Sequence, residues 1–130
     1  MNISNAIVFG SNFGLKSHFS TIKNFRSIKN LYIYSPNIVK KNISNKYILK
    51  NLKNENLKNI DFFSIATPPI IQKKLCLLGV KKGVKYFFLE KPISNSLDST
   101  KKILKIFKSK KIKYLVNFIY PNIDLFKIFK

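Results

Sequence analysis

The stretch that decides the fold is Ala6-Ile7-Val8-Phe9-Gly10-Ser11-Asn12-Phe13-Gly14, near the start of the chain. Its first four residues are apolar, which predicts a short strand buried on both faces, and Gly10 ends that strand. Beyond Gly14 the apolar residues recur at spacings of four and three up to Phe25, so they form the single stripe of a helix. A buried strand that passes through a glycine turn into a helix is typical of the beginning of a βαβ unit.

The rest of the chain repeats this alternation of strand and helix. Short apolar runs predict further strands at residues 31–34, 60–66, 86–89 and 114–118. Helical spacing predicts a helix from Pro69 to about Lys82 and another that follows Ser96. Residues 37–59 are rich in asparagine and lysine and predict only one short helix. Strands and helices in this order predict an α/β fold with a doubly wound parallel sheet.

The composition is that of one folded domain. The 130 residues suffice for a single ordinary domain, and 45% of them are hydrophobic, which excludes a disordered chain. Lysine, asparagine or glycine interrupts every apolar run, so no run is long enough to cross a bilayer. The N-terminus has no early basic residue and does not resemble a secretory signal, so we expect a cytoplasmic protein. The single cysteine, Cys76, excludes an internal disulfide framework and a multi-cysteine zinc site, and we expect no metal.

The net charge of +20 has two interpretations. It would suit nucleic acid or another anionic surface, because 25 residues are basic and only 5 are acidic. All the basic residues except Arg26 are lysines, however, and the other abundant residue types are those whose codons are rich in A and T. Nucleic-acid surfaces usually recruit arginine for its bidentate grip on phosphate and guanine. We therefore favour a genome that has drifted toward A+T, and expect neither a specific nucleic acid nor a membrane as a partner.

Three segments follow three of the predicted strands. They are residues 10–14, 66–69 and 90–92, and in an open parallel sheet ligands bind at the carboxyl ends of the strands. Residues 10–14 suit a turn whose backbone approaches a pyrophosphate at a helix N-terminus. The usual G-x-G-x-x-G pattern is altered, since Asn12 replaces the second glycine and Gly14 comes one residue early. An ordinary strand-to-helix turn is the alternative for this segment taken alone.

Together the three segments resemble one family. Residues 10–18 (Gly-Ser-Asn-Phe-Gly-Leu-Lys-Ser-His), 65–69 (Ile-Ala-Thr-Pro-Pro) and 88–92 (Phe-Leu-Glu-Lys-Pro) look like the N-terminal domain of the glucose-fructose oxidoreductase, inositol dehydrogenase and rhizopine-catabolism (Gfo/Idh/MocA) family. Their order and spacing match over essentially the whole chain. The resemblance implies a Rossmann domain that binds NAD or NADP. It also implies an oxidoreductase that acts on a small carbohydrate-like substrate, at a hydroxyl of a sugar, cyclitol or nucleotide sugar, and it allows for a homo-oligomer.

The resemblance also implies the site residues. Lys91 would be the catalytic residue, beside the nicotinamide and the substrate hydroxyl, where an ammonium can stabilise an alkoxide. The cofactor-binding residues would be Gly10, Ser11, Asn12, Phe13 and Gly14 near the pyrophosphate, Ala66, Thr67 and Pro68 along the adenosine and ribose, and Ser35, Glu90 and Lys91. His18 fits the family pattern, but a lone histidine near a turn more often packs against the fold, so we predict a packing role. Gln72 is expected either to touch the cofactor or to face solvent.

Two departures from the family pattern leave alternatives open. The second strand ends in Tyr34-Ser35-Pro36 without an acidic residue for the ribose hydroxyls, while Ser35, Lys40 and Lys41 could meet a 2′-phosphate, which favours NADP over NAD. Residues 1–120 are expected to form the dinucleotide-binding domain, and residues 121–130 to begin a crossover into a second, substrate-binding domain that the chain lacks. That domain would carry the aspartate and histidine for proton transfer. The alternative function is therefore a non-catalytic Rossmann domain that binds a nucleotide or a partner protein.

Overall fold

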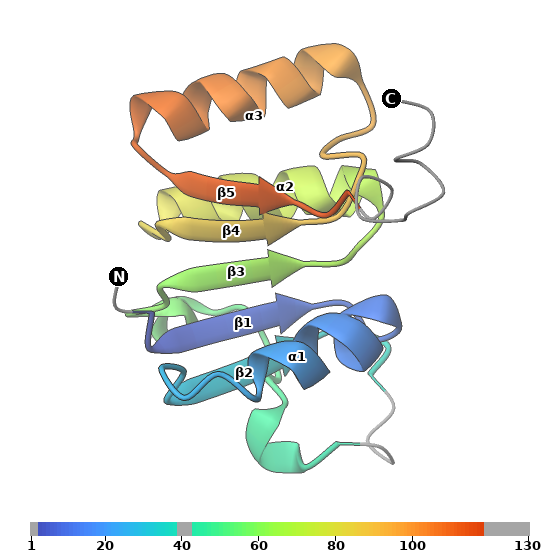
Figure 1. Ribbon diagram of the computed structural model, residues 1–130, viewed down its shortest axis with the longest axis vertical. Helices are drawn as coiled ribbons and strands as arrows, with labels where there is room; N and C mark the ends of the chain where they lie inside the picture. The colour runs from blue at the N-terminus through green and yellow to red at the C-terminus, as the bar shows by residue number, and fades with distance from the viewer. Residues whose placement is uncertain (1–2, 39–42, 119–130) are drawn as a thin grey trace, which may run out of the picture.

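The computed structural model describes residues 3–38 and 43–118. They contain one parallel sheet in the order β2-β1-β3-β4-β5 (Figure 1). Its strands are β1 (Asn5–Phe9), β2 (Asn30–Tyr34), β3 (Phe62–Ile65), β4 (Tyr86–Leu89) and β5 (Lys113–Val116). The strand order reverses at β1, whose two neighbours are β2 and β3, so the predicted doubly wound α/β fold is confirmed.

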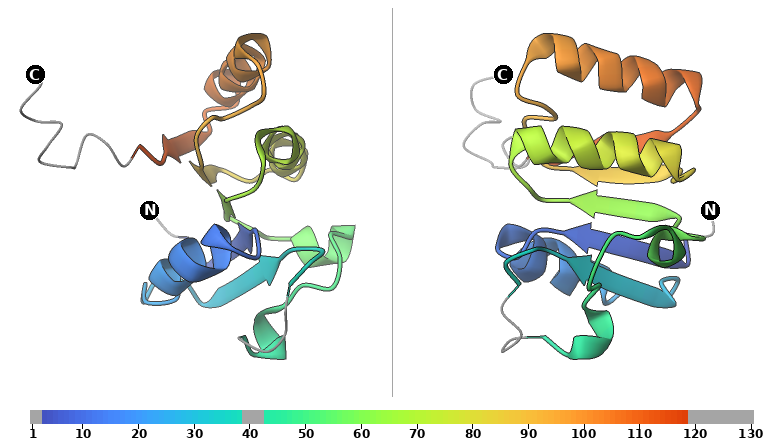
Figure 2. Two further views of the ribbon diagram at one scale, coloured as in Figure 1. Left: turned by 90° about the vertical axis from the view of Figure 1, so that its right-hand side faces the viewer. Right: turned by 180° about the vertical axis from the view of Figure 1, so that it is seen from behind.

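Helices lie on both faces of this sheet. A π-helical stretch, η1 (Gly14–Phe19), continues directly into α1 (Ser20–Ile22), and both lie on one face. Helices α2 (Pro69–Lys81) and α3 (Leu97–Ser109) lie on the opposite face (Figure 2). Within residues 3–38 and 43–118, no helix is long and apolar enough to cross a membrane.

The first helix is shorter than the sequence predicts. The apolar spacing predicts a helix up to Phe25, but the helix ends at Ile22. The backbone then tightens, because the Asn24 N–H donates to the Thr21 carbonyl (3.1 Å) and the Phe25 N–H donates to the Ile22 carbonyl (3.0 Å). Phe25 is 56% exposed, so it does not extend the buried stripe of this helix.

The short helix predicted between β2 and β3 is wrong. The chain instead makes two single 3₁₀ turns, η3 (Asn45–Tyr47) and η4 (Asn54–Leu57), and Ile48 forms an isolated parallel bridge with Ile33 of β2. The Asn51 side-chain oxygen accepts a hydrogen bond from the Lys53 N–H (3.0 Å). Such local bonds from asparagine compete with the hydrogen bonds of a helix, which explains why no helix forms here.

The core consists of two layers, one on each face of the sheet. Ile7 and Phe9 of β1 pack with residues of α2 and α3, whereas Ala6 and Val8 pack with residues of η1 and α1. This alternation is the two-residue period of a strand, and it confirms that β1 is buried on both faces. Cys76 of α2 lies in the first layer, where burial raises the pKa of its thiol to about 12.

The amino edge of the sheet is tied together by Asp61, which directly precedes β3. One oxygen of its carboxylate, Oδ2, accepts hydrogen bonds from the backbone N–H groups of Ser4 and Asn5, both at 2.9 Å. These bonds connect β3 to the start of β1 at the end of the sheet remote from the predicted site.

Candidate functional site

The glycine turn after β1 lies against the end of β3. Gly10 has a φ of +117°, and a Cβ at this position would overlap the carbonyl oxygen of Ala66. A Cβ on Gly14 would lie 2.8 Å from the Phe9 carbonyl oxygen. Glycine is therefore required at both positions by sterics, and at Gly10 also by the backbone conformation. The turn brings bare backbone to the carboxyl edge of the sheet.

The helix that follows this turn begins without a side-chain cap. Phe13 precedes it and makes no capping hydrogen bond. The first N–H groups of a helix have no intrahelical acceptor, and they carry the positive end of the helix dipole. The start of η1 therefore offers donors to an anion, which is the chemistry that a pyrophosphate needs.

The end of β3 contains a polar atom without a partner. The Ala66 N–H donates to the Phe9 carbonyl (2.9 Å), which fixes this end of β3 beside the glycine turn. The hydroxyl oxygen of Thr67 is buried and has no hydrogen-bond partner among the described residues. Because a buried hydroxyl without a partner is costly, Thr67 marks a place where a bound molecule would supply the missing bond.

The turn after β4 carries Glu90, Lys91 and Pro92, with a cis peptide bond between the last two. The Gln72 amide nitrogen donates to the carbonyls of Glu90 (2.6 Å) and Pro92 (2.9 Å), and its oxygen accepts from the Glu90 N–H (3.1 Å). Gln72 is fully buried, so neither of its predicted roles, cofactor contact or exposure to solvent, describes it. The side chain of Lys91 is exposed at the same edge.

His18 connects the first helix to this turn. Its Nδ1 lies 2.7 Å from the Ser64 hydroxyl oxygen, and its Nε2 lies 2.9 Å from Oε1 of Glu90. The same Glu90 oxygen accepts a hydrogen bond from the Asn117 side chain (2.7 Å). The ring of His18 is 4.6 Å from that of Phe88 and is nearly fully buried. The sequence predicts that His18 packs against the fold but does not indicate either of its polar partners.

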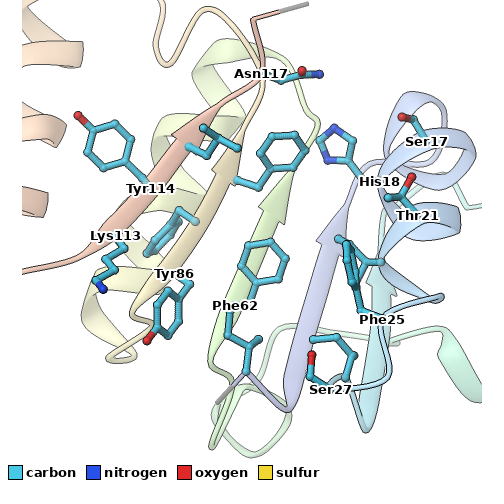
Figure 3. A pocket seen from close by; sticks show the side chains of 16 residues that line it. Ser17, His18, Thr21, Phe25, Ser27, Phe62, Tyr86, Lys113, Tyr114 and Asn117 are labelled. Carbon is cyan, nitrogen blue, oxygen red and sulfur yellow. The ribbon is translucent and has the colours of Figure 1, made fainter. Parts of the chain in front are cut away.

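A groove of about 700 Å³ runs from this network along the sheet face that carries α1 (Figure 3). Its lining is largely apolar, with Phe62, Tyr86 and Tyr114 contributed by β3, β4 and β5. His18 and Asn117 lie at its end toward the carboxyl edge. The groove therefore opens beside the polar network.

A second cavity, of about 660 Å³, lies between the first helix and the segment after β2. Ser11, Lys16, Lys23 and Asn37 are among its polar lining residues, and none of the lining residues that the structure describes carries a carboxylate. Ser35 directly follows β2 and is half-buried, whereas Lys40 and Lys41 lie outside the described residues. Lys16 and Lys23 give this cavity a positive charge, which attracts a phosphate group.

The parallel sheet brings all the predicted site residues to its carboxyl edge, because each follows the end of a strand. Only some of them touch. Gly10 packs against Ala66. Glu90 is hydrogen-bonded to His18, and the side chain of Lys91 is exposed at the turn after β4. Within the described part of the chain, no three metal-ligating side chains cluster.

A doubly wound sheet with a glycine turn at a helix N-terminus defines the class of dinucleotide-binding Rossmann domains. Residues 5–118 match the family described as the oxidoreductase family with an NAD-binding Rossmann fold (GFO_IDH_MocA), so the chain belongs to this family. The resemblance that the sequence motifs indicated is therefore confirmed, as is an NAD(P)-binding Rossmann domain. Among curated proteins, none matches the sequence.

Solved structures share the fold at low sequence identity. A dehydrogenase from Clostridium difficile has a TM-score of 0.77 at 18% identity, over 98% of this chain and 43% of that chain. The myo-inositol 2-dehydrogenase from Lactobacillus plantarum has a TM-score of 0.71 at 16% identity, over 96% of this chain and 39% of that chain. An NAD-binding protein from Listeria innocua has a TM-score of 0.67 at 16% identity, over 88% of this chain and 35% of that chain. The chain thus spans less than half the length of these structures.

Proposed function

We propose that this chain binds NADPH or NADH at the carboxyl edge of its sheet and serves an oxidoreductase that acts on a hydroxyl of a sugar, cyclitol or nucleotide sugar. The observation that carries the proposal is the buried, unpaired hydroxyl of Thr67 beside a turn where Gly10 leaves no room for a side chain. A ligand that supplies a hydrogen bond explains the unpaired hydroxyl, and the packing of Gly10 on Ala66 keeps the bare backbone of the turn beside it. The myo-inositol 2-dehydrogenase among the similar structures supports a polyhydroxylated substrate.

The residues of the chain divide into binding and reacting groups. The Gly10 N–H already donates to the Tyr34 carbonyl (3.1 Å), so the backbone N–H groups of residues 11–14 would hold the pyrophosphate. Ala66, Thr67 and Pro68 would lie along the adenosine and ribose. The bound nicotinamide supplies the hydride acceptor or donor. The ammonium of Lys91 would stabilise the negative charge that develops on the substrate oxygen, and its exposure leaves it accessible to a substrate.

NADP is the cofactor that this site favours. Lys16 and Lys23 line the cavity beyond β2, and Ser11 and Asn37 add polar groups to it. A 2′-phosphate would gain from these positive charges, whereas no acidic residue for the ribose hydroxyls of NAD occurs among the described lining residues. We therefore expect tighter binding of NADPH than of NADH.

The proposal assigns residues 1–120 to the dinucleotide-binding domain and residues 121–130 to the start of a crossover. The groups that complete proton transfer would come from a further domain, since the similar structures are more than twice as long as the matched region. Asn12, which stands where the usual pattern has glycine, keeps one rival open, a non-catalytic nucleotide-binding domain.

Titration with NADPH and NADH, followed by nicotinamide fluorescence, tests the proposal. Thr67→Val keeps the shape of the side chain but removes the hydroxyl, so we expect it to weaken NADPH binding by about tenfold. It should not lower the free energy of unfolding, because no hydrogen bond within the described chain is lost.

Thr100→Val is the matched control. The Thr100 hydroxyl donates to the Ser96 carbonyl (3.0 Å) at the start of α3, away from the proposed site. This variant should lower stability slightly and leave NADPH affinity unchanged. Absence of saturable binding of either cofactor to the wild-type chain at millimolar concentration would refute the proposal. Saturable binding to the chain, with no turnover of any polyol by the protein that includes the further domain, would favour the non-catalytic rival.

A further inference from the structure

We infer that His18, Glu90 and Asn117, with Ser64 behind them, position the turn that carries Lys91. The inference rests on the proposed function, in which Lys91 acts beside the nicotinamide. It gives the Glu90 side chain a role in holding the turn instead of contacting the cofactor, and it makes His18 and Glu90 positioning residues. We call these four side chains the carboxyl-edge clamp.

The Glu90 carboxylate is directed into the protein. Its side chain is only 18% exposed, and Oε1 lies 2.9 Å from Nε2 of His18 and 2.7 Å from the amide nitrogen of Asn117. His18 belongs to η1, and Asn117 follows β5. One carboxylate oxygen thus joins the first helix to the far edge of the sheet across the end of β4.

The backbone of Glu90 is held as firmly as its side chain. Its N–H lies 3.1 Å from the Ile65 carbonyl and also 3.1 Å from the side-chain oxygen of Gln72. Its carbonyl accepts the Gln72 amide at 2.6 Å. Hydrogen bonds therefore hold the N–H, the carbonyl and the carboxylate of Glu90. Because Glu90 directly precedes Lys91, these bonds fix the position from which the Lys91 backbone continues.

The hydrogen-bond donors of the clamp all point toward the Glu90 carboxylate, directly or through His18. A carboxylate can only accept, so Nε2 of His18 carries the proton that it donates to Glu90. In a neutral imidazole Nδ1 then accepts, and the Ser64 hydroxyl donates to it across 2.7 Å. The donors of Ser64, His18 and Asn117 all lead to Glu90, which is the arrangement in which hydrogen bonds reinforce one another.

Aromatic contacts restrict the imidazole to this orientation. The ring of Phe88 packs 4.6 Å from the His18 ring, and the ring of Phe13 meets its edge at 5.4 Å. Phe13 belongs to the turn proposed to hold the pyrophosphate. The carboxyl-edge clamp therefore lies between the two halves of the proposed site, the turn at residues 10–14 and the turn that carries Lys91.

Because His18 is the only histidine of the chain, nitrogen NMR of its imidazole tests the first step without any cofactor. We expect the tautomer that is protonated on Nε2. A tautomer protonated on Nδ1 would overturn the inference, since Glu90 would then face a nitrogen that has no proton. This result is independent of whether the proposed function holds.

The second step is tested with Glu90→Ala and Glu90→Gln. Glutamine keeps an oxygen that accepts from His18 and Asn117, so Glu90→Gln should preserve the ordered backbone of Lys91 measured by amide relaxation. Glu90→Ala should loosen it and increase amide exchange at residue 90 by about tenfold. With NADPH added, Glu90→Ala should lose the chemical-shift change at Lys91 but keep it at residues 10–14, with the dissociation constant changed less than threefold.

Asp61→Ala is the control, because it removes a carboxylate that accepts comparable hydrogen bonds at the opposite edge. It should lower stability and leave the order of Lys91 intact. The inference fails if Glu90→Ala leaves Lys91 as ordered as in the wild type, if Glu90→Gln loosens it as much as alanine does, or if Asp61→Ala loosens it equally. If NADPH shifts no resonance of the wild type, the proposed function fails, while the tautomer and the order of Lys91 still decide the clamp.

Discussion

The two edges of the sheet each hold a carboxylate, but the two carboxylates have different partners. At the amino edge, Asp61 accepts from the backbone N–H groups of Ser4 and Asn5 at 2.9 Å and, at a longer 3.4 Å, from the Asn5 side chain. At the carboxyl edge, Glu90 accepts from the side chains of His18 and Asn117. Backbone donors are available from any residue except proline, whereas side-chain donors require particular residues on separate elements. The difference indicates that the carboxylate of the amino edge is held mainly by backbone donors, while that of the carboxyl edge is held by side chains from two separate elements.

Replacing one glycine at each edge by alanine should give the largest difference in the free energy of unfolding between the two edges. Gly10 and Gly83 both have positive φ, +117° and +79°, but a Cβ on Gly10 would overlap the Ala66 carbonyl oxygen, whereas a Cβ on Gly83 would meet nothing within 4 Å. We expect Gly10→Ala to lower the free energy of unfolding by about 3 kcal/mol or more, and Gly83→Ala by about 1 kcal/mol. Urea unfolding followed by circular dichroism measures both.

The comparison is informative because the two variants share the same unfolded-state effect of replacing glycine by alanine. The excess loss for Gly10→Ala therefore reports the close approach of the turn to β3. Equal losses would mean that the turn can move away from Ala66 at little cost, and the argument for a closely approached backbone would not hold.

Removal of the amino-edge carboxylate should have an intermediate effect. Asp61→Ala leaves two backbone N–H groups without their acceptor, so we expect a loss of about 2 kcal/mol in the free energy of unfolding. Asp98→Ala is the control, since Asp98 is exposed in the first turn of α3, where a carboxylate contributes about 0.3–1 kcal/mol through the helix dipole.

Cofactor binding sharpens this prediction. Asp61 lies at the edge remote from the proposed site, so Asp61→Ala should leave the dissociation constant of NADPH unchanged under conditions where the variant is folded. A tenfold weaker binding would show that the two edges are energetically coupled, which contradicts the division of roles between them.

Most of the fold could be predicted from the sequence, because local patterns decide it. The apolar run at residues 6–9 and the strand-ending residues Pro36 and Pro92 act over a few positions. The parallel order of strands then brings residues 10–14, 66–68 and 90–91 to one edge by topology alone. The segment after β2 could not be predicted, because its asparagine side chains bond to nearby backbone.

The clamp could not be predicted, because it depends on contacts between distant residues. His18 and Glu90 are 72 positions apart, and Gln72 and Glu90 are 18 apart. Strand register and helix rotation decide whether such side chains meet, and neither can be read from spacing along the chain. The signal available in the sequence is chemical: His18 and Gln72 are polar residues on two predicted helices, and a polar side chain that becomes buried must find partners.

The smallest effect on stability is expected for Lys91, although it has the largest proposed role in the reaction. Lys85 and Lys91 flank β4 at the amino and the carboxyl edge, and both are exposed. Each alanine variant should therefore change the free energy of unfolding by less than about 0.5 kcal/mol. NADPH affinity should also stay within about threefold of the wild type, because the pyrophosphate would be held by backbone N–H groups at residues 11–14. In the proposed oxidoreductase, Lys91→Ala should lower turnover by on the order of a hundredfold, and Lys85→Ala should not, since only the lysine at the carboxyl edge would meet the developing charge. Nicotinamide absorbance follows this turnover. Equal turnover in the two variants would mean that the carboxyl edge binds without Lys91 reacting, and the non-catalytic rival would then explain the geometry of this edge better than an oxidoreductase does.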